Sequence, residues 1–322
     1  MPKDRHATIA DVARTANVSR TLVSFVLNGR KDVAPATRVR ILQAIEELGY
    51  RPNAVARNLA MKRAGAIGIV CDMEAYQDPL DMQFLAAILT TTPEMGQRVM
   101  LIPTDDRQIQ EVAQDHAVDG MIFLDERVSD PRIAQLLEMG IPAAGLWGDH
   151  LDTGLRTGFE ELALHLESRG LQRAVCLCGP CDKLFVTKFR QVLTDTLQEH
   201  GIAVDTVYHC PPDTETEAAR AVTHKLKGYG PTVIVASSDK LAINAIHGLH
   251  AMRLRVPDDC AVTGFGDVPA AQWVQPPLTT IRVPVKAMAV WALTSVFKEE
   301  GTDKPEILHS GVGSRLIVRR SC

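Results

Sequence analysis

The first fifty residues carry short apolar stripes with the spacing of helices. In residues 9–16 apolar side chains recur at helical intervals, directly after Thr8, which suits an N-cap. Asp11 falls in the first turn, where the helix dipole favours a negative charge. Asn17 tolerates the left-handed backbone of a tight turn. The pattern therefore predicts a two-turn helix that ends at Asn17.

A second helix is predicted from Ser19, a good cap, to Gly29, which would stop it. Its inner stripe and outer face are distinct in the sequence. The stripe consists of Leu22, Val23, Val26 and Leu27, and the outer face of Arg20, Thr21, Ser24 and Asn28. Two short helices joined by about three turn residues, with the small Ala13 where they cross, form a helix-turn-helix.

A third helix is predicted between Pro35, which suits a first helical position, and Gly49, which suits a helix end. Its core face is expected to consist of Val39, Leu42, Ile45 and Leu48. Because helices this short are unstable alone, the three must pack as one small bundle.

From residue 66 onward, short apolar runs alternate with segments of helical length. The runs 66–70, 98–103, 120–124 and 142–147 read as buried strands, and the pattern restarts at 173–178, 203–209, 232–237 and 260–265. Two consecutive strand–helix series predict an α/β body with two doubly wound parallel sheets. Such sheets bind ligands at the carboxyl ends of their strands, so the expected pocket is the cleft between the two lobes.

Composition indicates an ordinary globular protein. The 322 residues, 46% of them hydrophobic, are enough for two or three domains with sizeable cores. No run of about 18 apolar residues is present, and the N-terminus lacks the apolar segment of a secretory signal, so we expect a cytoplasmic protein without membrane contact. The seven scattered cysteines are expected to be reduced thiols.

The net charge of −4 conceals a division along the chain. Residues 1–63 contain twelve Lys and Arg and five Asp and Glu, a net charge of +7, whereas the remaining residues contain 23 and 34, a net charge of −11. A basic N-terminal segment on an acidic body fits attraction to nucleic-acid phosphates at one end only. A solvated basic face is the alternative.

Two segments resemble the lactose-repressor family of bacterial transcription regulators: 8–28, which reads TIADVARTANVSRTLVSFVLN, and 46–56, which reads EELGYRPNAVA. Phrases at 118–123, 236–242, 256–267 and 276–281 extend the resemblance over essentially the whole chain. It implies a DNA-binding headpiece (1–52), a hinge helix (53–63) and a two-lobed effector-binding and dimerisation domain (64–322) like the periplasmic sugar-binding proteins. It also implies that the chain returns to the first lobe near 284–300 before ending in the second.

The resemblance implies that the second helix enters the major groove of a palindromic operator, bound by a homodimer. The implied DNA-contacting residues are Thr8, Ser19, Arg20, Thr21, Ser24, Phe25, Asn28, Asn53, Ala56, Arg57 and Leu59. Arg20, Thr21 and Phe25 fall on the specificity positions, and Leu59 on the hinge residue that enters the minor groove. Phe25 is a departure, since the family often has arginine there. It either contacts a thymine methyl or packs against the headpiece.

The implied effector site matches the family less well. Its candidate residues are Trp147, Phe189, Arg190, Asp239, Gly266 and Asp267. Phe189 stands where the family usually has a sugar-gripping arginine, and Gly266 replaces the first of two aspartates. A sugar site needs convergent polar groups, so a carbohydrate, a different ligand and no ligand all remain open. Trp147 either stacks on a ligand or fills the core.

Other chemistry has weaker support. Cys178 and Cys181 form a C-x-x-C pair, which suggests redox or metal chemistry, but a Gly-Pro turn is usual for the family here and a fourth metal ligand is not evident. A solute-binding protein is contradicted by the headpiece, and an enzyme lacks a nucleophile–base pair or a phosphate-binding loop. The sequence predicts a non-enzymatic, allosteric transcription regulator without cofactor or metal, with repression as the expected action.

Overall fold

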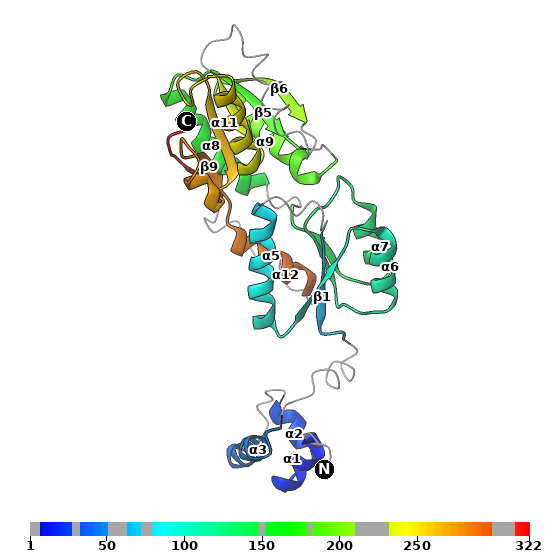
Figure 1. Ribbon diagram of the computed structural model, residues 1–322. Coiled ribbons are helices and arrows are strands. Elements are labelled where there is room, and N and C mark those ends of the chain that lie inside the picture. Colours follow the sequence, from blue (N-terminus) through cyan, green and yellow to red (C-terminus); the bar gives the residue numbers. More distant parts are fainter. Residues whose placement is uncertain are drawn as a thin grey trace. The chain divides into compact units, whose positions relative to one another are not determined.

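The computed structural model describes residues 7–27, 33–50, 63–71, 79–147, 152–179, 182–209, 232–297 and 313–322 (Figure 1). The chain divides into two compact units, Met1–Gly65 and Ala66–Cys322. The predicted boundaries of headpiece (1–52), hinge (53–63) and body (64–322) stay predictions.

The first unit contains three helices, α1 (Ile9–Thr15), α2 (Arg20–Leu27) and α3 (Pro35–Glu47). A capping box begins α1: the Thr8 backbone N–H donates to Asp11 Oδ2 (3.0 Å), and the Asp11 N–H donates to Thr8 Oγ1 (3.4 Å). Asn17 has a φ of 52°, the left-handed conformation expected for the turn. The Ser19 hydroxyl accepts a hydrogen bond from the Leu22 N–H (3.2 Å), so it caps α2.

The bundle core confirms the inner stripes of α1 and α2 and corrects that of α3. Its buried residues are Val12, Ala13, Ala16, Val23, Val26, Val33, Ile41 and Ala44. On α3 the predicted core residues Val39 and Leu42 are 53% and 51% exposed, and Ile41 and Ala44 are buried instead. Two apolar stripes overlap on this helix, and the stripe with the small Ala44 faces the bundle, where a short side chain permits close helix packing.

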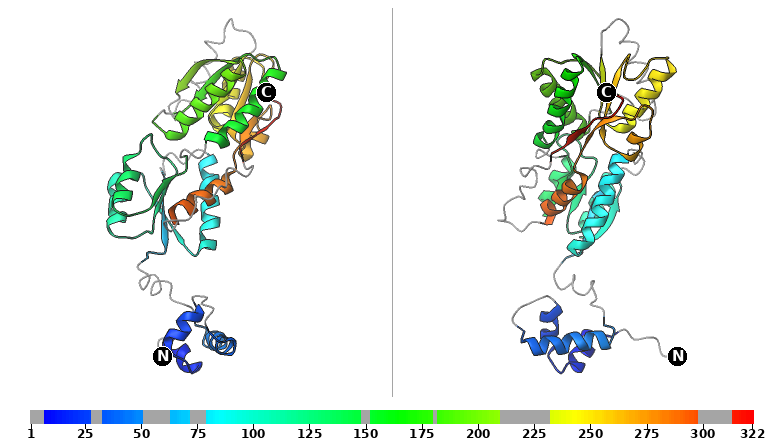
Figure 2. Two further views of the ribbon diagram at one scale, coloured as in Figure 1. Left: turned by 180° about the vertical axis from the view of Figure 1, so that it is seen from behind. Right: turned by 90° about the vertical axis from the view of Figure 1, so that its left-hand side faces the viewer.

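Lobe 1 of the body (residues 66–147 and 285–297) has a four-stranded parallel sheet of order β2-β1-β3-β4 (Figure 2). Its strands are β1 (Ala66–Val70), β2 (Arg98–Ile102), β3 (Met121–Phe123) and β4 (Ala143–Gly145). Its helical segments are α5 (Pro79–Thr91), η1 (Thr92–Met95), α6 (Asp106–Gln114), α7 (Pro131–Glu138) and α12 (Val285–Phe297). Every strand coincides with a predicted apolar run.

Lobe 2 (residues 152–282 and 313–322) has a six-stranded sheet of order β10-β9-β8-β7-β5-β6. Its strands are β5 (Arg173–Cys178), β6 (Ala203–His209), β7 (Val233–Ala236), β8 (Ala261–Gly266), β9 (Thr279–Arg282) and β10 (Arg315–Ile317). Its helical segments are α8 (Asp152–Ser168), α9 (Leu184–Glu199), α11 (Asp239–Ala251) and η3 (Pro269–Gln272). Parallel pairing confirms the predicted doubly wound sheet, except that β10 joins β9 antiparallel.

The chain crosses back between the lobes as expected. After β9 in lobe 2, α12 packs in lobe 1, where a Cβ added to Gly120 would lie 2.1 Å from Val296 Cγ1. The chain then returns to lobe 2 as β10. One continuous apolar cluster contains buried residues of both lobes, including Ile67 of β1 and Phe265 of β8. The carboxyl ends of both sheets therefore meet across a packed interface.

Candidate DNA-binding surface and interlobe site

The outward side of α2 is polar and accessible. Ser19, Arg20 and Thr21 are exposed at its N-terminal end, whereas Val23 and Val26 are buried against the bundle. The helix therefore has one anchored side and one side that can meet a partner. An α-helix of this size fits the major groove of B-DNA, where base edges carry a distinct pattern of donors and acceptors.

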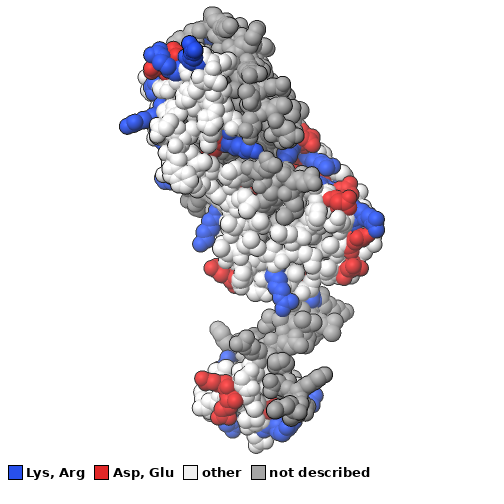
Figure 3. Space-filling view, in the orientation of Figure 1, with Lys and Arg blue, Asp and Glu red and all other residues white. Residues whose placement is uncertain are grey.

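Arg20 makes no ion pair or hydrogen bond with any residue in the described part of the chain. The N–H donors of its guanidinium are therefore available to a partner, and a guanine edge can accept hydrogen bonds from two of them. Phe25 is partly buried and packs against the headpiece core, yet it retains accessible surface. Both interpretations of Phe25 are thus compatible with its position. Figure 3 shows basic side chains on several parts of the headpiece surface, some of them beside the acidic ones.

The remaining DNA-contact candidates divide into two groups. Thr8 is exposed at the N-terminus of α1, with its hydroxyl engaged by Asp11 (2.6 Å), and Ser24 is partly buried on α2. Five candidates lie outside the described residues: Asn28, Asn53, Ala56, Arg57 and Leu59. The predicted hinge helix, apart from Arg63, lies there too.

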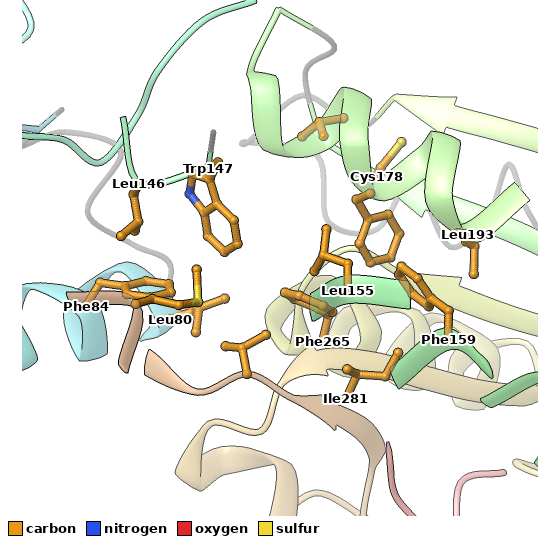
Figure 4. Close-up of a cluster of buried hydrophobic side chains, with 14 of the residues drawn as sticks. Leu80, Phe84, Leu146, Trp147, Leu155, Phe159, Cys178, Leu193, Phe265 and Ile281 are labelled. Carbon is orange, nitrogen blue, oxygen red and sulfur yellow. The ribbon is translucent and has the colours of Figure 1, made fainter. Parts of the chain in front are cut away.

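Trp147 lies in the interface between the lobes, just after β4. It is 4% exposed, with the Phe84 ring of α5 edge-on to it at 5.3 Å and the Phe185 ring of α9 at 4.3 Å. Figure 4 shows its indole between Leu80 and Phe84 on the lobe 1 side and Leu155 and Phe265 on the other. Trp147 is thus packed in the apolar cluster of the body, and its role toward a ligand stays a prediction.

Phe189 is fully buried. Its ring is perpendicular to that of Phe265 at 5.4 Å and edge-on to that of Phe159 at 5.2 Å. We call the six rings that meet here the interlobe aromatic cluster: Phe84, Trp147, Phe159, Phe185, Phe189 and Phe265. The side chain at the family's arginine position thus contributes packing in place of charge.

The two acidic effector candidates, Asp239 and Asp267, form their hydrogen bonds and ion pairs within lobe 2. Asp267, whose side chain is 3% exposed, pairs with Arg282 (2.5 Å) and Arg319 (2.5 Å). Asp239 is buried at the start of α11, where its carboxylate accepts hydrogen bonds from the Val268 N–H (2.7 Å) and the Thr280 hydroxyl. Both carboxylates hold lobe 2 together, because a buried carboxylate needs such partners. Their predicted contact with an effector stays a prediction.

The other two candidates, Gly266 and Arg190, lie in different surroundings. A Cβ added to Gly266 would lie 3.5 Å from Leu80 Cδ1, so this glycine is in contact with α5 of lobe 1. Arg190 lines a surface hollow of about 400 Å³ together with Thr187, Gln191, Thr194 and Asp195. That hollow follows one helix, α9.

Sequence reasoning missed a bridge between the lobes. The Val128 N–H donates to the Asp182 carbonyl (3.1 Å), and the Leu184 N–H donates to the Glu126 carbonyl (3.0 Å). Arg127 and Lys183 form the antiparallel pair between them. A Lys183 Nζ to Asp125 Oδ1 ion pair (2.7 Å) adds a charge contact. We call residues 125–128 and 182–184 the interlobe bridge. Polar residues directly after a β-strand are the signal that would have pointed to 125–127.

Glu126 joins this bridge to Trp147. Its side chain is buried, and Oε1 accepts a hydrogen bond from the Trp147 backbone N–H. Its own carbonyl accepts the hydrogen bond from Leu184 across the interface. Glu126 therefore holds the backbone of Trp147 in place and also contacts lobe 2.

The thiol candidates are core residues. Cys178 is fully buried in the apolar cluster, and its proposed partner Cys181 lies outside the described residues. The hydrogen bond between the Cys176 and Cys178 thiols, together with burial, raises the pKa of Cys176. The same hydrogen bond and the charge of Arg190 lower the pKa of Cys178, although burial opposes this. Burial in the apolar cluster keeps the Cys178 thiol away from reactants. Within the described ranges, no three His, Cys, Asp or Glu side chains are placed to hold a metal.

Taken together, a helix-turn-helix unit with an accessible second helix and a two-lobed α/β body define the class of DNA-binding regulators with a periplasmic-binding-protein-like domain. Residues 8–53 match the model of bacterial regulatory proteins of the lacI family, and residues 163–322 match a periplasmic binding protein-like domain. The regulator MalR of Streptomyces coelicolor is 30% identical over 315 residues, covering 91% of this chain and 90% of MalR.

The chain belongs to the lacI family of bacterial regulatory proteins, and it is a DNA-binding transcriptional regulator, not an enzyme. Catabolite control protein A of Priestia megaterium is 28% identical over 320 residues, covering 92% of this chain and 95% of that protein. The fold is also that of the lac repressor dimer bound to operator and the anti-inducer ONPF, with a TM-score of 0.72 and 21% identity, covering 98% of this chain and 99% of that one. No helix in the described residues is long and apolar enough to cross a membrane.

Proposed function

We propose that this chain represses transcription by binding a palindromic operator as a homodimer, with one α2 in the major groove of each half-site. The observation that carries this is the exposed Ser19–Arg20–Thr21 end of a helix whose other side is buried. Arg20 reads a guanine, and Thr21 and Phe25 contact a thymine methyl or base edge. Thr8, Ser19, Ser24 and Asn28 contact phosphates, which set the register of the helix on the duplex.

The hinge completes the contact with DNA. Asn53, Ala56 and Arg57 lie in the minor groove or on its phosphates, and Leu59 enters a central base step. A flexible pyrimidine–purine step would reduce the cost of that insertion, so part of the specificity comes from how easily the operator bends. The resemblance of residues 46–56 to the family supports this assignment.

The dimer contact is on lobe 1. Exposed apolar side chains gather on α5, η1 and the edge strand β2: Met82, Leu89, Met95, Met100 and Leu101. An edge strand with exposed apolar residues tends to associate with another chain unless an element of its own chain covers it. A second copy of the chain is the occupant that a two-fold operator requires. The solved structure of the lac repressor dimer bound to operator supports this stoichiometry.

A small molecule between the lobes modulates operator affinity by changing how the lobes pack. The structure of the regulator CelR with cellobiose shows that a relative of this fold binds a small molecule. We place the protein in the cytoplasm, because that is where a bacterial regulator meets its DNA.

The role of Arg20 is testable by substitution. The Arg20→Ala variant should lose discrimination at one base pair per half-site by about 1 to 3 kcal/mol, because the bidentate contact to guanine disappears. Operator sequences are first selected from a random pool with the wild-type protein, and affinities for single-base variants are then measured at fixed salt.

Arg40→Ala provides the matched control. Arg40 is an exposed arginine on α3, so its loss removes the same charge from a helix other than α2. It should leave the sequence preference unchanged. If Arg20→Ala lowers the affinity for every duplex equally, Arg20 contacts a phosphate and not a base. If the wild-type protein prefers no duplex over the others, the proposed function is overturned.

A further inference from the structure

Helix α3 carries an apolar stripe that the headpiece leaves uncovered. Pro35, Val39 and Leu42 recur at helical intervals on one face, and all three are exposed, Val39 at 53% and Leu42 at 51%. The other face of α3 contributes the buried Ile41 and Ala44 to the bundle core. Single exposed apolar residues are common on protein surfaces, but a contiguous stripe indicates a contact site. The stripe is therefore available to a partner outside the bundle.

Neither end of α3 is matched to the helix dipole. Its N-cap residue, Ala34, offers no side-chain hydrogen bond, and its first turn has no acidic residue. Its last turn has no basic residue and contains Glu46 and Glu47, both of which are exposed. A helix dipole favours the reverse, with negative charge at the N-terminus and positive charge at the C-terminus. No side chain of α3 itself compensates either end.

A second copy of α3, packed antiparallel, fits both features. In this arrangement Val39 of each copy lies against Leu42 of the other. The same face continues four residues beyond Leu42 to Glu46, which then lies at the N-terminus of the other α3. Its carboxylate supplies the negative charge that the first turn lacks. Because the arrangement is two-fold, each copy gives and receives the same contacts, so the stripe and the end charges favour the same occupant.

This pairing is too small to hold two free molecules together. The stripe spans about two helical turns, so it buries much less than the roughly 1,200 Å² of a stable protein interface. It contributes when both copies are already held close together, because tethering raises their effective concentration. The proposed function supplies such a tether, since two dimers on neighbouring operators share one duplex.

The two α3 helices of one dimer do not form this pair. Recognition helices on a two-fold operator lie about 34 Å apart, whereas packed helices lie about 8–10 Å apart. Since α3 packs beside α2 in the bundle, the two α3 helices of one dimer stay at least about 14 Å apart, which is beyond contact. The second copy therefore belongs to a neighbouring dimer.

We propose that the exposed face of α3, formed by Pro35, Val39, Leu42 and Glu46, joins the headpieces of two dimers on adjacent operators and makes their binding cooperative. The partner is a second copy of this chain. This inference rests on the proposed function and adds to it a requirement for paired operators at a fixed spacing. The requirement arises because helix pairing fixes the distance and the rotational phase of the two headpieces on the duplex.

The test uses full-length protein and duplexes with one or two copies of its selected operator. Gel-shift titrations at fixed salt give the affinity for one operator and the cooperativity ratio, by which the first dimer strengthens binding of the second. The operator spacing is varied one base pair at a time over two turns of the duplex. The wild type should reach a ratio of at least about tenfold at a preferred spacing.

The variant Val39→Gln, Leu42→Gln should reduce this ratio to about one, because the apolar contact is lost without any change of charge near the DNA. Its affinity for a single operator should stay within about twofold of wild type, since both side chains are exposed and lie outside the bundle core. Leu164→Gln is the matched control. Leu164 is a 58% exposed leucine on α8 of lobe 2, and its replacement should leave the ratio unchanged.

Glu46→Gln separates pairing from the stability of α3. It removes a negative charge from the C-terminal turn, so α3 itself should be unchanged or slightly more stable. The cooperativity ratio should nevertheless fall by at least about twofold, because the N-terminus of the other α3 loses its carboxylate.

A wild type that binds one operator specifically, without cooperativity at any spacing, overturns the inference and leaves the proposed function standing. Cooperativity that survives in Val39→Gln, Leu42→Gln also overturns it. So does an equal loss of affinity by that variant for one operator and for two, because the stripe then packs within a single bound dimer. A protein with no preferred duplex overturns the proposed function and this inference together.

Discussion

At the scale of single residues, Gly145 shows how the interlobe site constrains the backbone. It ends β4, and a Cβ added to it would lie 1.0 Å from Glu126 Oε2. Glu126 is buried and holds the Trp147 backbone, so its carboxylate has little room to move. Glycine is needed here for close approach of a side chain, not for an unusual φ, since this glycine is not among those with positive φ.

Gly145→Ala should lower the free energy of unfolding by about 1 to 3 kcal/mol, because the new methyl group displaces a buried carboxylate. The change in the free energy of unfolding is measured by urea unfolding, monitored with circular dichroism. Gly154→Ala on α8 is the control: a Cβ there has no atom within 4 Å, so the change should be neutral or slightly stabilising. An unchanged urea midpoint for Gly145→Ala would mean that the Glu126 carboxylate can move aside without a loss of stability.

At the scale of elements, the start of α7 depends on a buried ion pair. Asp130 is the N-cap residue and accepts hydrogen bonds from the Arg132 N–H (3.1 Å) and Nε (2.8 Å). The Arg132 guanidinium lies over the Phe123 ring at 5.0 Å and donates to the Thr104 carbonyl. Burial opposes the charge of Asp130, but the hydrogen bonds and charge of Arg132 hold its pKa below the ordinary value.

This depressed pKa makes the stability of lobe 1 depend on pH. A carboxyl with a lowered folded-state pKa contributes stability that is present above its ordinary value of 3.8 and is lost as the pH falls through the folded-state value. Asp130→Asn should therefore be less stable than wild type near neutral pH, and the difference should shrink below about pH 4. Urea midpoints across the acid range measure this.

Glu111→Gln is the control for the pH series. Glu111 pairs with Arg107 on the surface of α6, and both side chains are exposed, so its removal should change stability little at any pH. A constant difference between Asp130→Asn and wild type down to the acid limit would show that the cap, not the charge, carries the effect.

At the scale of the whole molecule, operator binding and dimerisation are linked by mass action. A two-fold symmetric operator binds more tightly to a protein that presents two α2 helices at once. The exposed apolar residues of α5 and β2 offer the surface for that assembly. Any change that weakens the dimer therefore weakens operator binding, although the headpiece is untouched.

Leu89→Glu should raise the dimer dissociation constant by at least about tenfold, because it buries a charge in an apolar contact. Sedimentation velocity over a concentration series measures the change, and operator affinity should fall with it. Leu137→Glu on α7 is the control: Leu137 is 55% exposed in lobe 1 but lies outside the proposed surface. A Leu89→Glu protein that remains a dimer would place the contact elsewhere.

Much of the fold was predictable, because its signals are local. Thr8, Asn17 and Ser19 act where their short-range preferences place them, and the apolar runs coincide with strands. The face of α3 was not predictable in this way. Val39 and Ile41 both lie on plausible stripes, and only packing against the other helices decides which is buried.

The amino-acid sequence by itself determined the helix-turn-helix, the alternation of strands and helices, and the placement of Arg20 on an outward helical face. Local propensity and periodicity are enough for these features. Only the tertiary structure decided that Trp147 is buried between the lobes, that Asp267 forms ion pairs with Arg282 and Arg319, and that Glu126 joins the lobes. These roles depend on contacts between residues distant along the chain, which no short-range pattern encodes.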